Sequence, residues 1–355
     1  MNIDKIFIKG FRNIEECTLS PNKGLNILYG DNAQGKTSAL EAIWMFTGAK
    51  SFRTNNDKSL KKIGCDYAKC SIEFTKENFG NTLKYTIEEK RKFFYNDKGL
   101  PSPQKAAGIF NAVVFSPKDL SIITDSPNIR RRYLDISIGQ LFPVYVDYLK
   151  QYNEALYQRN RCIKDYKYDP TLDILLTSFE EQLNNYGDKI RKYRYAYIKH
   201  LNNYIEDIYY NLSGKKENIK IEYIYDDENI AEALKFMRCE DINTGTTSIG
   251  PHRDDLAIAI NELNARGYAS QGQTRSIALA LKFASCRVVR ELNGEYPILL
   301  LDDVLSELDL HRRDYILNNI HHCQTFITVC NLNDISGFKG GNIYNVRSGD
   351  ICIST

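Results

Sequence analysis

The eight residues from Gly30 to Thr37, Gly-Asp-Asn-Ala-Gln-Gly-Lys-Thr, constrain the fold of this chain more than any other segment. They match the pattern G-x-x-x-x-G-K-[ST] at every fixed position. An apolar run at residues 24–29 precedes them, and apolar residues with helical spacing follow at 36–46. Because this pattern has its meaning where a strand leads into a helix, the flanking runs support the match. The segment therefore predicts a phosphate-binding P-loop in an α/β domain.

The glycines of this loop let backbone N–H groups turn toward phosphate oxygens, and the positive N-terminus of the following helix adds to the attraction. Lys36 is expected to reach the β- and γ-phosphates of ATP, and the Thr37 hydroxyl to bind Mg²⁺. A chance glycine-rich turn is the alternative, which the flanking strand and helix disfavour. The expected ATP-binding residues of the loop are Gly30, Asp31, Asn32, Ala33, Gln34, Gly35, Lys36, Thr37 and Ser38.

An acidic motif, Pro-Ile-Leu-Leu-Leu-Asp-Asp, stands at residues 297–303. A buried strand that ends in an acid is what a Walker B site requires, because the carboxylate then meets the Mg²⁺ shell where the strand ends. Asp302 is the expected Mg²⁺ ligand beside Thr37, and Asp303 is expected to orient or deprotonate the attacking water. Many related ATPases carry Glu at that place, so the shorter Asp303 is compatible with slow hydrolysis.

A third motif, Ser-Gln-Gly-Gln-Thr-Arg at residues 270–275, precedes an apolar helix and resembles the signature loop of ABC-type ATPases. In that class the loop acts on ATP held by the other subunit, and a D-loop such as residues 306–309 follows the Walker B strand. Ser270 is then a catalytic residue together with Lys36 and Asp303. An ordinary helix N-cap is the alternative reading. The residues expected to contact the partner's ATP are Ser270, Gly272 and Gln273.

Periodicity divides the rest of the chain. Short β-rich pieces between residues 67 and 95 predict an antiparallel sheet beside the P-loop sheet. From Leu176 to Leu212 apolar residues recur in steps of three and four, which predicts a helix of about 40 residues. The expected fold is an α/β ABC-type P-loop ATPase head with an antiparallel β lobe and an inserted helical arm domain; a compact bundle of ordinary helices is the alternative to the arm. The expected segments are 1–118 for the N-terminal part of the head, 119–215 for the arm and 216–355 for the C-terminal part of the head.

Composition limits the compartment and the partners. Forty-seven Lys and Arg residues against 45 Asp and Glu leave a net charge of +2, so any nucleic-acid surface must be a local patch. Nine cysteines, an odd number without zinc-site spacing, favour reduced thiols and a cytoplasmic location. The N-terminal residues contain no long apolar run, so neither a signal peptide nor a membrane helix is expected.

Further stretches resemble the RecF family of bacterial recombination and replication-repair ATPases. Residues 250–256, Gly-Pro-His-Arg-Asp-Asp-Leu, are the most specific of them. The others are Phe-Arg-Asn at 11–13 and the segments 115–120, 127–135 and 152–160. With the ATPase motifs, they extend the resemblance over essentially the whole chain.

The resemblance implies a head like that of SMC proteins, with a short arm, that binds DNA and forms a homodimer on ATP. It implies recombinational repair and replication restart with RecR and RecO, in which the protein promotes recombinase loading at single-strand gaps and supports SOS induction. It also implies weak, DNA-stimulated ATP hydrolysis. The DNA can be single-stranded, gapped or a duplex junction. By the same resemblance, Arg12 and Asn13 would contact the nucleotide phosphates.

Two departures from related ATPases favour slow hydrolysis: residues 113–117 contain no Gln, and the strand at 324–329 is followed by Cys-Asn without a His. Three other functions stay open. An ABC-type ATPase subunit coupling ATP to a non-DNA partner gives no role to the arm or to the 250–256 motif. A scaffold with a vestigial ATP site is hard to reconcile with intact Lys36, Thr37 and Asp302, and a P-loop kinase has no use for a signature loop.

For DNA contacts, the chain offers one dense basic cluster away from the P-loop, on the predicted arm helix. A DNA groove flanked by two arms would place such residues against phosphates. A solvated helix face is the alternative, and Arg53 with residues 58–62 on the head are the next candidates. The members of the arm cluster are Lys189, Arg191, Lys192, Arg194 and Lys199.

Overall fold

The computed structural model describes residues 1–166, 169–226, 229–332 and 340–354. The chain forms two compact units. The head unit contains Met1–Leu120, Tyr204–Asn218 and Ser270–Thr355, and the arm unit contains Ser121–Asn203 and Ile219–Ala269. This division differs from the three predicted segments in two main respects. Residues 204–215, predicted in the arm, belong to the head unit, and residues 219–269, predicted in the head, belong to the arm unit.

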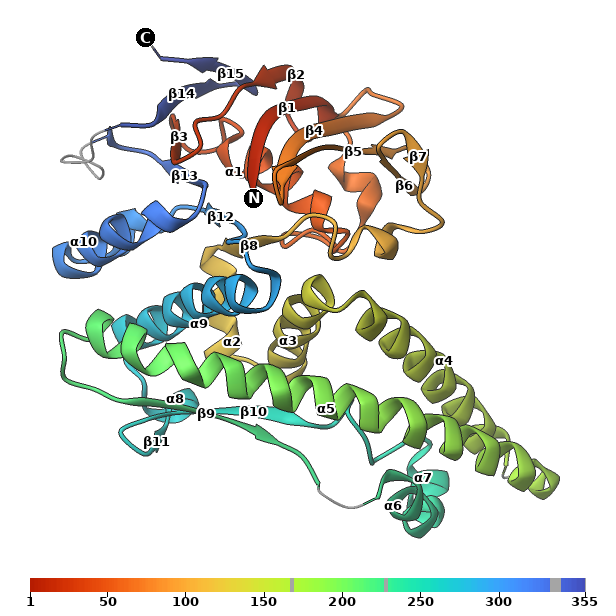
Figure 1. Cartoon of the computed structure of the whole chain (residues 1–355). Coiled ribbons are helices and arrows are strands. Elements are labelled where there is room, and N and C mark those ends of the chain that lie inside the picture. The colour runs from red at the N-terminus through yellow and green to blue at the C-terminus, as the bar shows by residue number, and fades with distance from the viewer. Residues whose placement is uncertain (167–168, 227–228, 333–339, 355) are drawn as a thin grey trace. The chain divides into compact units, whose positions relative to one another are not determined.

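A six-stranded sheet of order β15-β14-β3-β13-β12-β8 forms the centre of the head unit (Figure 1). Each neighbouring pair from β14 to β8 is parallel, and only β15 runs antiparallel to its neighbour. Residues of β12, β13 and β8 are buried throughout, as expected of a parallel sheet covered on both faces. The strands are β3 (Leu25–Tyr29), β8 (Ala112–Phe115), β12 (Ile298–Leu301), β13 (Thr325–Val329), β14 (Asn342–Arg347) and β15 (Asp350–Ile353). The apolar strands predicted at 297–301 and 324–329 are thereby confirmed.

The predicted antiparallel sheet is also present in the head unit, with the order β2-β1-β4-β5-β6-β7. Its buried face carries aromatic residues that pack on residues after the first helix, as in the Phe46–Tyr85 pair with ring centroids 4.8 Å apart. The strands are β1 (Asn2–Phe11), β2 (Ile14–Leu19), β4 (Ala68–Lys76), β5 (Phe79–Ile87), β6 (Arg91–Tyr95) and β7 (Lys98–Gly99). The α-helices that lie wholly in the head unit are α1 (Lys36–Trp44), α9 (Gln271–Asn293) and α10 (Leu310–Asn319).

The arm unit is built on a helical hairpin. Helix α5 (Asp173–Leu212) is 40 residues long, which confirms the predicted length. It runs antiparallel to α4 (Pro143–Asp165): Leu176 near the start of α5 packs on Ile163 near the end of α4, whereas Tyr193 contacts Tyr145 near the start of α4. The remaining helices are α2 (Ser121–Thr124), α3 (Pro127–Leu141), α6 (Ile230–Phe236), α7 (Arg238–Thr244) and α8 (Ala265–Tyr268), and a sheet of order β11-β10-β9 contains β9 (Ile219–Ile224), β10 (Asp255–Ile260) and β11 (Leu263–Asn264).

Ion pairs explain why residues 219–269 join the arm unit. Arg130 of α3 forms a bidentate pair with Asp255 of β10, with N–O distances of 2.7 and 2.9 Å. Arg191 of α5 forms a second bidentate pair with Asp254, at 2.9 and 3.0 Å. These pairs join segments more than 60 residues apart, so sequence periodicity could not reveal them. Across the described ranges, each helix is too short or too polar to cross a lipid bilayer.

Candidate functional site

The phosphate loop connects β3 to α1 and depends on one close backbone approach. Gly35 precedes α1 with φ of 119°, in the region that favours glycine, and a Cβ at this position would lie 2.8 Å from the Asn13 side-chain nitrogen. Asn13 Nδ2 donates to the carbonyl of Gln34 at 2.9 Å. Its Oδ1 is buried without a hydrogen-bond partner. The loop therefore packs on Asn13 and leaves a buried acceptor of that side chain without a partner.

The ammonium group of Lys36 lies inside the loop. The side chain is buried, and Nζ donates to the carbonyl oxygens of Gly30 and, at 2.9 Å, Asp31. Nζ also lies 3.2 Å from Sγ of Cys330, the residue after β13. Carbonyl dipoles hold the ammonium without neutralising it, since they carry no net charge. A full positive charge is therefore kept where a P-loop binds phosphate.

The carboxylate of Asp302 stands directly after β12 and faces two hydroxyl groups. Thr37 Oγ1 donates to Asp302 Oδ1 at 2.7 Å, and Thr328 Oγ1 of β13 donates to the same oxygen at 3.0 Å. Burial raises the pKa of Asp302, and the two hydrogen bonds oppose that rise. Carboxylate and hydroxyl oxygens are hard donors, and Mg²⁺ usually binds one or two carboxylates with the remaining positions filled by phosphate and water. The pair Thr37 and Asp302 therefore fits Mg²⁺.

Asp303 has an unusual backbone conformation for a residue with a side chain. Its φ is 49°, in the left-handed region. Its N–H donates to Thr328 Oγ1 at 2.8 Å, and its Oδ1 accepts from Ser306 Oγ at 3.0 Å. These bonds hold the strained turn and place the carboxylate on the wall of the pocket.

One pocket of about 670 Å³ collects most of the predicted site residues. Gly30 and Asp31 belong to the loop but do not line the pocket, and Ser270, Gly272 and Gln273 do not line it either. Sequence reasoning missed five lining residues. Of these, only Thr328 gave a local signal, as a polar residue in an apolar strand. The predicted residues in the lining are Arg12, Asn13, Asn32, Ala33, Gln34, Gly35, Lys36, Thr37, Ser38, Asp302 and Asp303, and the missed ones are Arg53, Ser59, Lys61, Ile63 and Thr328.

Two arginines of the pocket share one buried carboxylate. Arg12 donates to both oxygens of Glu41 in α1, at 2.8 and 2.9 Å, and to the carbonyl of Ser59. Arg53 lies 3.5 Å from the same carboxylate, and its side chain is 41% exposed. Two positive charges against one negative charge leave the wall positive. This electrostatic arrangement favours a polyphosphate, and it places Arg53 in the wall of the pocket.

Ser270 is the N-cap of α9 and forms a reciprocal capping box with Gln273. The Gln273 N–H donates to Ser270 Oγ at 3.2 Å, and the Ser270 N–H donates to Gln273 Oε1 at 2.7 Å. Ser270 is exposed at the surface. The segment therefore has the geometry of an ordinary helix N-cap, which was the alternative interpretation. Because this N-cap is exposed, it is also compatible with a contact to a second subunit.

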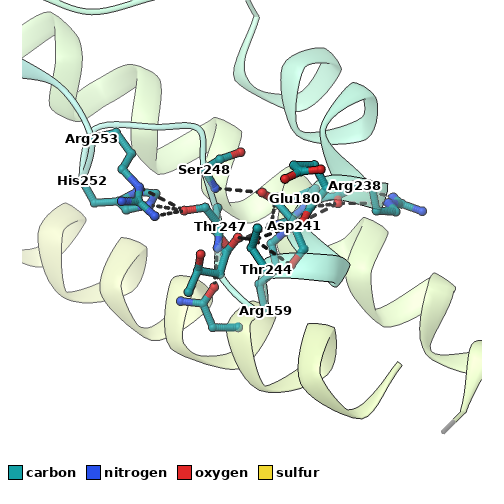
Figure 2. Close-up of polar contacts among 12 residues, drawn as sticks. Arg159, Glu180, Arg238, Asp241, Thr244, Thr247, Ser248, His252 and Arg253 are labelled. Atoms are coloured by element: carbon teal, nitrogen blue, oxygen red, sulfur yellow. Dashed lines mark hydrogen bonds and ion pairs between the residues drawn. The ribbon is translucent and has the colours of Figure 1, made fainter. Parts of the chain in front are cut away.

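The 250–256 motif forms a loop whose charged groups are satisfied inside the arm unit. Figure 2 shows His252 and Arg253 directed at the carbonyl of Thr247, with contacts of 3.0 and 2.9 Å. Because a carbonyl only accepts, His252 Nε2 carries the proton, and Nδ1 accepts from the Tyr152 hydroxyl at 2.7 Å. Burial lowers the pKa of His252 to about 4, so the ring is neutral at pH 7.

A second buried group, centred on Arg159 of α4, supports this loop (Figure 2). Arg159 is fully buried and pairs with Asp241 at 2.7 Å and with Glu180 at 2.9 Å. It also donates to the Thr247 hydroxyl at 2.8 Å. Arg238 pairs with Glu180 from the other side. The most family-specific motif of the sequence thus makes its described polar contacts within the arm unit.

The proposed DNA cluster on α5 needs correction. Arg191 and Arg194 are buried, and they pair with Asp254 at 2.9 Å and with Asp135 at 2.8 Å. They cannot reach DNA phosphates while these pairs persist. Lys192 and Lys199 are exposed. Lys189 lies 5.1 and 5.6 Å from the ring centroids of two tyrosines and is partly exposed. Only the three lysines remain available for phosphate contacts.

Comparisons with known proteins extend over nearly the whole chain. The family model of the RecF/RecN/SMC N-terminal domain matches residues 2–347. The DNA replication and repair protein RecF of Clostridium perfringens (strain SM101) is 38% identical over 362 residues and covers 99% of each chain. RecF of Clostridium novyi is 39% identical over the same length and coverage.

Solved structures give the same result. The recombination mediator protein RecF-ATPrS in the RecFOR pathway aligns with a TM-score of 0.92 at 33% identity, over 99% of this chain and 98% of that one. The Smc head domain of Pyrococcus furiosus aligns with a TM-score of 0.60 at 16% identity, over 99% of this chain and 96% of that one. This second likeness concerns the fold alone and confirms the predicted ABC-type head.

Proposed function

This chain belongs to the RecF family, and we propose that it acts in DNA replication and repair as an ATP-dependent DNA-binding protein. The observation that carries this proposal is the arrangement of Lys36, Thr37 and Asp302 in one pocket with a positive wall. The similar proteins named RecF-ATP and RecF-ATPrS support ATP as the nucleotide.

The proposed chemistry is hydrolysis of the bond between the β- and γ-phosphates. Backbone N–H groups of the loop and Lys36 bind the phosphates. Thr37 and Asp302 would hold Mg²⁺, which would neutralise phosphate charge when bound. Asp303 orients a water or accepts its proton. Its side chain is shorter than the Glu of many related ATPases, and the hydrogen bond from Ser306 occupies one of its carboxylate oxygens. Both features support slow hydrolysis. Asp303→Asn should therefore retain ATP binding and trap the ATP-bound state.

We propose that two heads close on ATP and that Ser270 of one head completes the site of the other. The exposed N-terminus of α9, outside the pocket of its own chain, supports this. Ser270→Arg should leave ATP binding by the monomer nearly intact and abolish ATP-driven dimers in light scattering. Dimers of this variant at wild-type strength would disprove the role of Ser270.

For the biological role, we propose that the ATP-bound dimer binds DNA and acts with RecR and RecO at single-strand gaps, where it promotes recombinase loading and supports SOS induction. The RecFOR pathway named for the similar structures supports these partners. We place this activity in the cytoplasm because all nine cysteines are free thiols, as a reducing compartment maintains them.

The decisive experiment measures DNA binding with and without ATP, on gapped, single-stranded and duplex DNA in one salt series. ATP should tighten binding, and Lys36→Met should remove the effect. ATP binding without any effect on DNA affinity would overturn the proposal and favour an ATPase subunit that couples ATP to a non-DNA partner.

The same assay tests the arm surface. Replacing Lys189, Lys192 and Lys199 together by Ala should reduce the salt slope of log K by about one unit for each DNA phosphate that these lysines neutralise. The matched control replaces the exposed residues Lys90, Lys92 and Lys98 of the β lobe, which removes the same charge. Equal effects of the two triple variants would show that the arm lysines contribute only net charge.

A further inference from the structure

The hydroxyl of Ser270 is held in an orientation suited to donate. Its oxygen accepts the Gln273 N–H, and a serine hydroxyl has one proton and two acceptor sites. The proton is therefore available to an acceptor outside the helix, beside the N–H groups of the first turn of α9. This arrangement suits a phosphate oxygen only while the capping box persists.

The capping box depends on which way the Gln273 amide is turned. Its Oε1 must face the Ser270 N–H, and its Nε2 donates to Oε1 of Glu217 at 2.7 Å. A carboxylate only accepts hydrogen bonds, so Glu217 fixes the NH₂ group toward itself and the oxygen toward Ser270. Sequence reasoning had no signal for Glu217, which lies 53 residues before the serine.

The position of Glu217 is set by the end of α5. Gly214 and Lys215 adopt left-handed conformations, with φ of 72° and 63°, and turn the chain back after Leu212. The second carboxylate oxygen of Glu217 then accepts from the hydroxyl of Tyr209, which is fully buried in the last turns of α5, at 2.8 Å. One carboxylate thus joins the end of the arm helix to the first turn of the signature helix.

We propose that Glu217 is a positioning residue through which the state of the arm helix controls the signature serine. Helix α5 begins in the arm unit and ends in the head unit, with Tyr204–Asn218 assigned to the head. A shift of its last turns displaces Tyr209 and Glu217, releases the Gln273 amide and loosens the cap at Ser270. This inference rests on the proposed function, because it concerns regulation of the composite ATP site.

The test compares ATP affinity of the monomer with ATP-driven dimerisation. Glu217→Ala should leave ATP affinity within about twofold and weaken dimerisation about tenfold, the effect of losing a charge-assisted hydrogen bond. Glu217→Gln should recover most of the dimerisation, because its amide can accept from Gln273 and donate to the Tyr209 oxygen. Glu206→Ala, an exposed glutamate on α5, is the matched control and should change neither quantity.

A double-mutant cycle tests whether Tyr209 acts through Glu217. Tyr209→Phe should weaken dimerisation and add nothing to Glu217→Ala. If Glu217→Ala does not fold, Gln273→Ala breaks the same link from the other end. Wild-type dimerisation of Glu217→Ala or of Gln273→Ala would overturn the inference alone, and additive effects would overturn the coupling to α5. A wild-type chain that binds ATP and stays monomeric would overturn the proposed function and this inference with it.

Discussion

The nucleotide pocket of the head unit and the Arg159 network of the arm unit contain similar side chains in opposite states. In the pocket, Lys36 and Asp302 contact carbonyl and hydroxyl groups, so each keeps its net charge for a ligand. In the network, Arg159 forms ion pairs with two buried carboxylates, which neutralise its charge within the folded chain. A charged motif therefore reveals its role through the charge of its partners, and the residue types alone do not distinguish binding from support.

The largest expected effect on stability follows from replacing Arg159, the centre of the Arg159 network. Arg159→Met leaves Asp241 as a buried carboxylate without its cation and Glu180 with Arg238 as its remaining partner, and it should cost about 3–5 kcal/mol of stability. Circular dichroism of the long helices measures this loss, while fluorescence of Trp44, the single tryptophan, follows the head unit separately. Arg161→Met, an exposed arginine on the same helix, is the control and should cost under about 1 kcal/mol. A loss equal to that of the control would mean that the network is not structural.

The matching substitution in the nucleotide pocket should lower ATP affinity and leave the stability of the fold nearly unchanged. Lys36→Met removes a charge that the fold does not neutralise, so ATP affinity should fall about 10- to 100-fold. The unfolding midpoint should change little, since the fold loses only hydrogen bonds to carbonyls. Isothermal titration with ATP and a denaturant curve measure the two quantities. A large stability loss with unchanged ATP affinity would invert the comparison.

Acid should lower the free energy of unfolding of the arm unit through His252. The pKa of His252 is about 4 in the folded chain and near 6.5 when unfolded, so the neutral ring contributes stability above pH 6.5 that is lost as pH falls toward 4. Between pH 7 and pH 5 the expected loss is about 2 kcal/mol. His252→Gln can keep both hydrogen bonds without titrating, and a pH series should show a flatter profile for it. Identical profiles for the two proteins would exclude His252 as the source.

The smallest expected effect is a change in melting temperature on replacing Asp302 of the nucleotide pocket. Burial raises the pKa of Asp302, so its charged form costs folding free energy at neutral pH. Asp302→Asn removes that charge and can still accept from Thr37 and Thr328, so the melting temperature should rise slightly while Mg²⁺-dependent ATP hydrolysis is lost. A lower melting temperature would mean that the carboxylate supports the fold more than burial penalises it.

The sequence predicted those parts of the site that are local. The P-loop and Asp302 were found because each follows its strand directly, and the length of α5 was found because its apolar period extends over 40 residues. Arg53 and Ile63 were missed as pocket residues because long-range backbone contacts bring their segment to β1: Lys62 donates to the carbonyl of Gly10. Arg191 was misassigned for the same reason, since its partner Asp254 lies 63 positions away.

The strand order of the central sheet has a consequence for synthesis of the chain. Strand β3 carries the P-loop and is flanked by β13 and β14, which pair with it through Thr325 and Asn342. Neither edge of β3 can pair until about 300 more residues have been synthesised, which takes roughly 15 to 60 s at elongation rates of about 5–20 residues per second. The arm unit is complete by Ala269 and can fold on the ribosome first. During that interval the nascent head exposes apolar strand edges, so its yield should depend on chaperones that bind such edges more than on the stability of the finished fold.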